Sequence, residues 1–383
     1  MESARSTHIV ANEIVLAVAL ELAQNSWKVA LQDGLHDRPS IHSVSHVQAC
    51  GRLEQVVELI RRMLEKWHLP ADTRVVVNYE AGQDGFWLVR ALARYGYEVL
   101  PIDAASIEVN RHQRRAKTDR IDAARLVNSL RGWLQGDRDR MRVLHVPSAE
   151  AEDQRQWMRD RGQIQKEINQ HLDRMRKLLR TQGCWVDHKM DIAELVKSGE
   201  LTDHSGAPLP ESLNLRLLRE CERLAQAEQQ LAKLEAGMLA ALPKATQDKV
   251  KALCMLKAIG PVGAQRLVTE LYWRDFHNRR EVGACVGLVP QPYDSGQSHV
   301  DQGISKQGNR RVRALLIEMA WFWLRYQPTS ELAQWFIKRT SGTGENKRHR
   351  KITIVGVARK LAIALWRYLD TGEIPAGAQL KMS

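Results

Sequence analysis

Cysteine is scarce in this sequence and does not occur in closely spaced pairs. The five cysteines stand alone, at positions 50, 184, 221, 254 and 285. A zinc ribbon needs C-x-x-C pairs, and a disulfide framework needs a dense, even set of cysteines. The scattered pattern argues against both and is typical of a reducing cytosol, so we expect a cytoplasmic location.

Long hydrophobic runs are also missing. The N-terminal apolar run, residues 14–20, is too short to cross a bilayer and lies between Glu13 and Glu21. It has neither the basic segment nor the small-residue cleavage site of a signal peptide. We therefore expect no signal peptide and no membrane partner.

The sequence has fewer acidic than basic residues. Against 57 Lys and Arg there are 45 Asp and Glu, which leaves a net charge of +12. This excess favours a polyanionic partner, most simply nucleic acid, although ribosome-binding and membrane-surface proteins share it. The length of 383 residues allows two or three domains, and a hydrophobic content of 44% is typical of a folded chain.

Two carboxylates stand three residues apart in a strongly basic stretch. Asp119 and Asp122 share one face if residues 119–125 are helical, so both can reach one Mg²⁺ ion. The cations before them, Arg114, Arg115 and Lys117, would then hold the phosphates of a nucleic acid. The alternative from these residues alone is a solvated helix start with ordinary N-terminal acids.

The elements before this stretch predict an α/β domain with a mixed sheet. They are a hairpin over residues 14–32, a helix over 52–67, a strand over 74–80, a helix over 86–95 and a strand over 98–102. A ribonuclease-H-like (RuvC-like) fold has this order, with acids at strand ends and on the closing helix. Here Glu21 ends the first strand and Glu80 a central one. With Asp119 and Asp122 they make the four carboxylates that two-metal phosphodiester chemistry needs.

These residues resemble a known family. Residues 79–82 read YEAG and residues 117–123 read KTDRIDA. Both are similar to motifs of the IS110 and IS1111 type of insertion-sequence transposases, the DEDD, bridge-RNA-guided DNA recombinases. The resemblance implies that Glu21, Glu80, Asp119 and Asp122 hold Mg²⁺ or Mn²⁺. The family more often has Asp at the first position, and Glu13 is the weaker substitute for Glu21.

Two long amphipathic helices are predicted next, over residues 149–182 and 213–242. Each carries one apolar stripe, and a polar segment, residues 183–210, joins them. This pattern favours an antiparallel coiled-coil arm whose stripes are packing surfaces. Family members use this region to join two domains and to assemble oligomers.

A glycine turn follows at residues 256–263, which read LKAIGPVG. It looks like a helix-hairpin-helix, whose backbone N–H groups can bind a phosphate. The alternative is a helix–turn–helix connection with no ligand.

The third part of the chain resembles the C-terminal transposase domain of the same family. The similarity lies in residues 287–290, 295–296 and 303–313. We expect a small-residue loop leading into a helix start that binds phosphate. In the family a serine of this domain attacks DNA, and by position we choose Ser295 over Ser305 and Ser298. The cations expected to bind nucleic acid here are Lys306, Arg310, Arg311 and Arg313, and those of a basic turn before the last helix are Lys347, Arg348 and Arg350.

Together these features predict three domains: a ribonuclease-H-like DEDD domain (residues 1–148), a coiled-coil arm (149–250) and a mainly α transposase domain (251–383). By resemblance, the partners are donor DNA, target DNA, a structured guide RNA and further copies of the chain in a homodimer or homotetramer. Two alternatives remain: a metal-dependent Holliday-junction resolvase that uses water, and a non-catalytic nucleic-acid-binding relic. A covalent protein–DNA adduct would distinguish the transposase from the resolvase. Metal-dependent strand cleavage would exclude the non-catalytic relic.

Overall fold

The computed structural model describes residues 14–82, 85–106, 118–295, 298–341 and 347–381, with the backbone alone for Ala105 and residues 293–295 and 298–301. The chain forms two compact units, residues 1–147 and 148–383. Within the described residues, no helix is both long enough and apolar enough to span a membrane.

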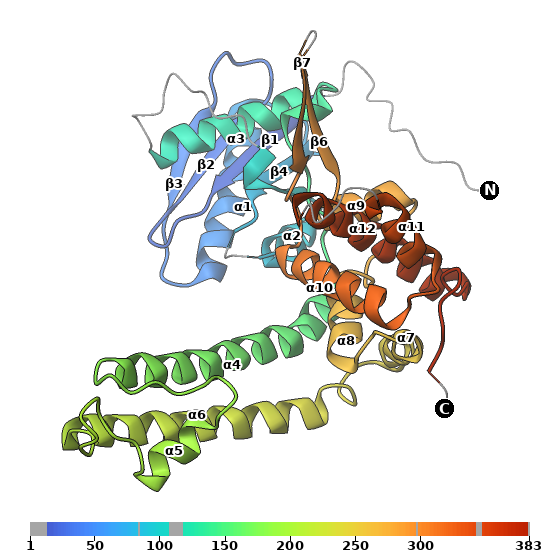
Figure 1. Cartoon of the computed structure of the whole chain (residues 1–383). Helices are drawn as coiled ribbons and strands as arrows, with labels where there is room; N and C mark the ends of the chain where they lie inside the picture. Colours follow the sequence, from blue (N-terminus) through green and yellow to red (C-terminus); the bar gives the residue numbers. More distant parts are fainter. Residues whose placement is uncertain (1–13, 83–84, 107–117, 296–297, 342–346, 382–383) are drawn as a thin grey trace. The chain divides into compact units, whose positions relative to one another are not determined.

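The first unit contains a five-stranded mixed sheet (Figure 1). Its strands are β1 (Val15–Glu21), β2 (Trp27–Gln32), β3 (Ser40–Val44), β4 (Arg74–Glu80) and β5 (Glu98–Ile102), in the order β3-β2-β1-β4-β5. β1, β2 and β3 pair antiparallel, whereas β1, β4 and β5 are parallel. This confirms the expected hairpin, both later strands and the mixed α/β class, and it is the strand arrangement that a ribonuclease-H-like domain requires.

Helices cover both faces of this sheet. The helices α1 (Ala49–Lys66) and α2 (Trp87–Ala93) pack on one face, and α3 (Asp119–Leu134) packs on the other. The strand β3 was not predicted. Its sequence, SIHSV, has few apolar residues because β3 is an edge strand with little to bury.

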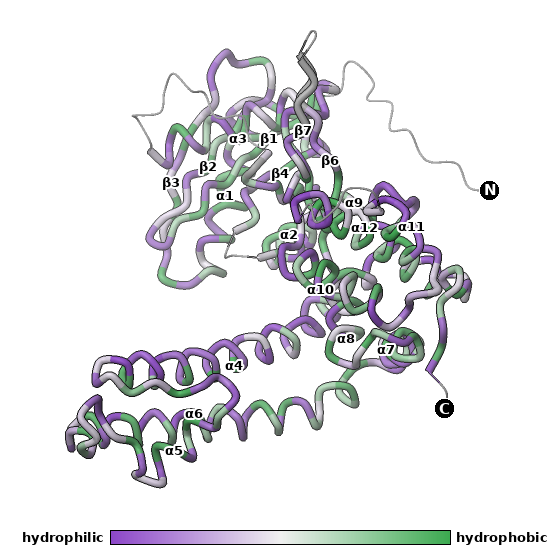
Figure 2. The backbone as a smooth tube through the Cα atoms, viewed as in Figure 1, coloured by the Kyte–Doolittle hydropathy of each residue, from purple (hydrophilic) through white to green (hydrophobic). Residues whose placement is uncertain are grey.

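The second unit begins with two long helices that lie side by side, α4 (Ala149–Arg180) and α6 (Glu211–Gly237) (Figure 1). They are antiparallel, because Arg161 pairs with Glu235 while His171, later in α4, pairs with the earlier Glu220. Each has one apolar face among polar residues, which Figure 2 shows as a mixture of hydrophobic and hydrophilic residues along both. Their buried faces share a core with α5 (Ile192–Ser198), a short helix within the joining segment.

The rest of the second unit is mainly helical around its own core. Its elements are α7 (Lys244–Met255), α8 (Pro261–Glu270), α9 (Arg279–Cys285), β6 (Pro290–Ser295), β7 (Ser298–Ile304), α10 (Arg310–Tyr326), α11 (Glu331–Thr340) and α12 (Lys347–Thr371). One expectation was incomplete here and one was wrong. The expected loop leads into α10 at residues 305–309, but the strands β6 and β7 before it form a hairpin that was not predicted. The strand β6 carries two prolines, which a two-stranded sheet tolerates because both its strands are edges. The basic residues 347–351 are the first turn of α12, because Lys and Arg are good helix formers even without an apolar pattern.

Candidate active site

Glu21 and Glu80 end two neighbouring parallel strands. Leu20 pairs with Tyr79 across β1 and β4, so the next residues on each strand, Glu21 and Glu80, are level with each other. Side chains alternate between the faces of a sheet. Ala19 lies in the core under α3, two residues before Glu21, so Glu21 points to the α3 face.

The same alternation places Glu80 on the α3 face, because Asn78, two residues earlier, reaches α3. The Asn78 Nδ2 donates a hydrogen bond to the Leu126 carbonyl at 3.0 Å. The two glutamates are therefore side by side at the carboxyl edge of β1 and β4, on the face that α3 covers.

The direction of α3 brings its first turn to this edge. The Arg131 Nη1 donates to the Val15 carbonyl at 3.2 Å, at the beginning of β1, whereas Leu126 lies over Asn78, near the end of β4. Moving toward the start of the helix thus means moving toward the carboxyl ends of the strands, by 1.5 Å per residue. Asp122, one turn before Leu126, and Asp119, at the helix start, therefore lie toward the edge that carries the glutamates.

The helix start is determined locally. Thr118 has an extended backbone, and its hydroxyl accepts a hydrogen bond from the Ile121 N–H at 3.3 Å, which makes it the N-cap of α3. Asp119 and Asp122 are the acids of the first turn, where the helix dipole favours negative charge. Asp122 also forms an ion pair with Arg125 at 3.4 Å.

The four carboxylates share an edge without forming a closed coordination sphere. Glu80 and Asp119 are exposed, while Glu21 and Asp122 are half-buried. Among the described residues, no three His, Cys, Asp or Glu side chains form a group that could hold a metal ion. Their chemistry nevertheless suits Mg²⁺, which takes one or two protein carboxylates and fills its remaining positions with water and phosphate oxygens.

Asn78 is a positioning residue that was not predicted from the sequence. Its side chain is fully buried and ties β4 to α3 through Leu126. An apolar strand that contains one buried amide is the signal that would have found it, because a buried polar group is retained only with a partner.

The three candidate serines lie in and after the β6–β7 hairpin. Ser295 ends β6 and pairs with Ser298, the first residue of β7. Ser305 follows β7, and its N–H donates to the Val289 carbonyl at 2.9 Å. The hairpin therefore holds Ser295 and Ser298 as a cross-strand pair at its turn, with Ser305 at its base.

The predicted cations are placed in different surroundings. Arg114, Arg115, Lys117 and the substitute acid Glu13 lie outside the described residues. The others that the structure places as exposed are Lys306, Arg310, Arg311, Lys347, Arg348 and Arg350.

Arg313 is engaged inside the protein. Its Nη1 donates to the carbonyls of Val286 and Gln307 at 3.1 and 3.2 Å, and burial lowers its pKa. Two of the first N–H groups of α10 are already hydrogen-bonded within the protein. The Asn309 Oδ1 accepts from the Arg311 and Val312 N–H groups at 3.0 and 3.2 Å. Binding of a phosphate by α10 would thus depend on its side chains more than on its first N–H groups.

Comparison with known proteins gives consistent matches along the chain. A transposase model of the DEDD IS110 type matches residues 42–182, and the model "Transposase IS116/IS110/IS902 family" matches residues 250–334. The first range contains Glu80, Asp119 and Asp122, and the second contains Ser295, whereas Glu21 lies outside both.

Several curated proteins are similar as well. "Putative transposase y4rJ" of Sinorhizobium fredii is 37% identical over 375 residues, 95% of this chain and 94% of that protein. "Probable family 20 transposase" of Pseudomonas aeruginosa is 26% identical over 334 residues, 85% and 94% of the two chains. "Transposase for insertion sequence element IS1111A" of Coxiella burnetii is 35% identical over 100 residues, 26% of each chain.

Proposed function

Because the chain belongs to the IS110 family of insertion-sequence transposases, we propose that it cuts and rejoins DNA with four metal-binding carboxylates and a serine nucleophile. The observation that supports this proposal is the placement of Glu21 and Glu80 at one edge of the sheet, toward which the first turn of α3 is directed. A nuclease of this class needs carboxylates from several elements near one another, and this arrangement directs acids from β1, β4 and α3 toward the same edge.

The four acids would hold Mg²⁺ or Mn²⁺. When bound, the ion would lower the pKa of the attacking hydroxyl and neutralise charge on the leaving oxygen. The protein would supply the anionic oxygens of Glu21, Glu80, Asp119 and Asp122, and Asn78 would keep α3 in position over β4. Exposed Glu80 and Asp119 leave room for the water and phosphate oxygens that complete the shell.

Ser295 is the proposed nucleophile. Its hydroxyl loses a proton and forms an Oγ–P bond, while one P–O bond of the DNA backbone breaks and the leaving oxygen becomes a hydroxyl. The phosphoserine ester conserves the energy of the broken bond. Attack by the hydroxyl of another DNA end then restores the phosphodiester and frees the serine.

The partners are proposed to be donor DNA, target DNA and a structured guide RNA that pairs with both. The exposed cations Arg310, Arg311, Lys347, Arg348 and Arg350, with Arg114, Arg115 and Lys117, would bind phosphates. The paired helices α4 and α6 are proposed to be a coiled-coil arm that joins two domains and assembles the chain into a dimer or tetramer.

The decisive experiment is detection of the serine–DNA ester. Wild-type protein and Ser295→Ala are incubated with labelled DNA, guide RNA and Mg²⁺, and the products are separated on a denaturing gel. We expect a covalent adduct from the wild type that maps to Ser295 by mass spectrometry, and none from the variant. An adduct at Ser298 or Ser305 would move the role within the hairpin region. Clean hydrolytic nicks without an adduct would favour the resolvase.

A further inference from the structure

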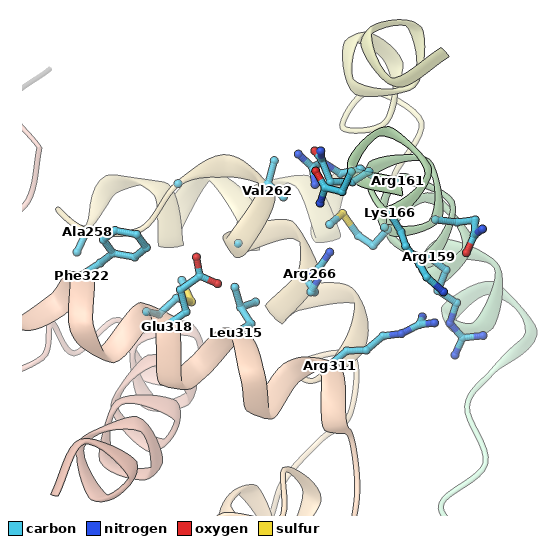
Figure 3. Close-up of a pocket in the computed structure, with 18 of the residues that line it drawn as sticks. Arg159, Arg161, Lys166, Ala258, Val262, Arg266, Arg311, Leu315, Glu318 and Phe322 are labelled. Carbon is cyan, nitrogen blue, oxygen red and sulfur yellow. The ribbon is translucent and has the colours of Figure 1, made fainter. Parts of the chain in front are cut away.

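A large cavity lies within the second unit, between α4, α8 and α10 (Figure 3). Its volume is about 1060 Å³. Pockets that hold whole small ligands measure roughly 300–1,000 Å³, so this one has room for a nucleotide and part of its neighbour. The proposed active-site acids and serine are not among its lining residues.

One side of the cavity is strongly cationic. Figure 3 shows three cations of α4 on this side, with one each from α8 and α10; they are Arg159, Arg161, Lys166, Arg266 and Arg311. Arg161 pairs with Glu235 at 2.7 Å. In the described part of the chain, Arg159, Lys166 and Arg311 form no ion pair, and all three are exposed. Their charges are therefore available to an anion.

Arg266 is half-buried. Its Nε is buried and has no hydrogen-bond partner among the described residues. Burial lowers its pKa, Glu270 and Glu318 oppose that effect, and the charges of Arg161 and Arg311 lower the pKa further. Positive charge is thus crowded here, and a bound phosphate would relieve the repulsion.

The other side of the cavity is aromatic. Phe322 and Tyr326, both on α10, are 42% and 48% exposed. Their rings are stacked, with centroids 6.4 Å apart and planes 26° from parallel. Large exposed aromatic rings facing a cavity offer a flat surface to another planar group. Figure 3 places Phe322 at the far end from the arginines, with Glu318 between them.

We propose that this cavity binds an unpaired segment of nucleic acid, with phosphates on the cationic side and bases stacked on Phe322 and Tyr326. Cations that follow the backbone, combined with aromatic platforms, are how proteins hold single strands. A duplex does not fit this arrangement, because its base faces are already stacked on one another. Glu318 repels a phosphate, but its carboxylate accepts hydrogen bonds from base amino groups, which favours bases at the aromatic end. The inference rests on the proposed function for its nucleic-acid partner and assigns new residues to it.

Binding by the full chain tests the cationic side. Fluorescence anisotropy is measured in EDTA with labelled single-stranded DNA, single-stranded RNA and a duplex of equal length. We expect the double variant Arg159→Gln/Lys166→Gln to bind single strands at least tenfold more weakly. Its slope of log affinity against log salt should flatten by about 0.7 for each phosphate that is no longer neutralised. Arg216→Gln, an exposed arginine of α6 outside the cavity, should bind as the wild type does.

The aromatic side is tested by Phe322→Leu and by crosslinking. Losing one stacked base should weaken single-strand binding about tenfold and leave the salt slope unchanged. Single strands that carry 5-iodouracil should crosslink to a peptide containing Phe322 or Tyr326 on irradiation, and the stronger of the DNA and RNA arms identifies the natural strand. Three results would overturn the inference: the variants weaken duplex binding as much as single-strand binding, Phe322→Leu leaves single-strand binding unchanged, or the crosslinks map only to peptides without Phe322 and Tyr326. Because no metal is present and no bond is cut, these results are independent of whether Ser295 forms an ester.

Discussion

The two aspartates at the start of α3 are the carboxylates that can be tested with the least disturbance of the sheet. We expect Asp119→Asn or Asp122→Asn to slow DNA strand cleavage roughly a hundredfold or more, because an amide keeps the shape of the carboxylate but loses its charge. Nucleic-acid binding should persist, since it depends on cations. The measurement is cleavage of labelled DNA in Mg²⁺ beside a binding titration.

Asp72→Asn is the matched control for these variants. Asp72 is exposed and precedes β4, at the opposite end of the strand from Glu80. The Asp72→Asn variant should cleave DNA at the wild-type rate. If both α3 variants cleaved DNA at the wild-type rate, Asp119 and Asp122 would have only the structural role of acids that stabilise a helix start.

Glu21 tests whether a longer side chain can serve as the first ligand. Glu21→Asp should keep activity, because it restores the residue more common in the family, whereas Glu21→Gln should lose cleavage because the charge is gone. Both variants are assayed for Mg²⁺-dependent cleavage at several metal concentrations. Full activity of Glu21→Gln would show that Glu21 is not the first metal ligand, and Glu13 would be the next residue to test.

At the scale of elements, the helix pair α4–α6 contains a buried ionic network. Glu220 is 2% exposed and accepts hydrogen bonds from His171, Arg174 and Arg223 at 2.6, 2.7 and 2.8 Å. Burial alone would raise the pKa of Glu220, but the hydrogen bonds from His171 and Arg174 outweigh it, so the pKa is lowered. Two of these donors, His171 and Arg174, belong to α4, whereas Arg223 belongs to α6 like Glu220 itself. A shift along the helix axis would therefore cost Glu220 both partners on α4, so the network specifies how the two helices align.

This network predicts how the stability of the α4–α6 pair depends on pH. Glu220→Gln should reduce the local stability of α6 by roughly 1.5–3 kcal/mol at neutral pH. The folded pKa is below the ordinary value of 4.5, so the carboxylate contributes fully above that value and loses its contribution as pH falls through the folded pKa. The difference between wild type and variant, measured by hydrogen exchange of α6 amides, should therefore shrink below pH 4.5. Glu222→Gln, at an exposed neighbouring position, should change little.

At the scale of the whole molecule, the proposed activity needs both units and a nucleic acid that selects the DNA. We expect a donor and a target plasmid to recombine only when the protein is supplied with the RNA that flanks its insertion sequence. The readout is sequencing of the new junctions. Efficient recombination without RNA would remove the guide from the proposal and leave the protein to recognise DNA by itself.

Local features of the sequence determined most of the elements and the identity of the candidate acids. The strands β4 and β5 have the predicted bounds because a short, mostly apolar run between polar residues has one favourable local structure. The start of α3 follows from Thr118 as N-cap, and the pairing of α4 with α6 follows from their apolar stripes. The positive charge and the spacing of Asp119 and Asp122 likewise belong to the sequence itself.

Tertiary structure alone decided how these parts meet. Strand register placed Glu21 level with Glu80, and the hydrogen bond from Asn78 to Leu126 set the position of α3 over them. The internal use of Arg313 and the cavity between α4, α8 and α10 likewise depend on packing between distant segments. The physical reason is that periodicity and capping act over a few residues, whereas register, burial and cavity shape are set by packing partners far away in the chain.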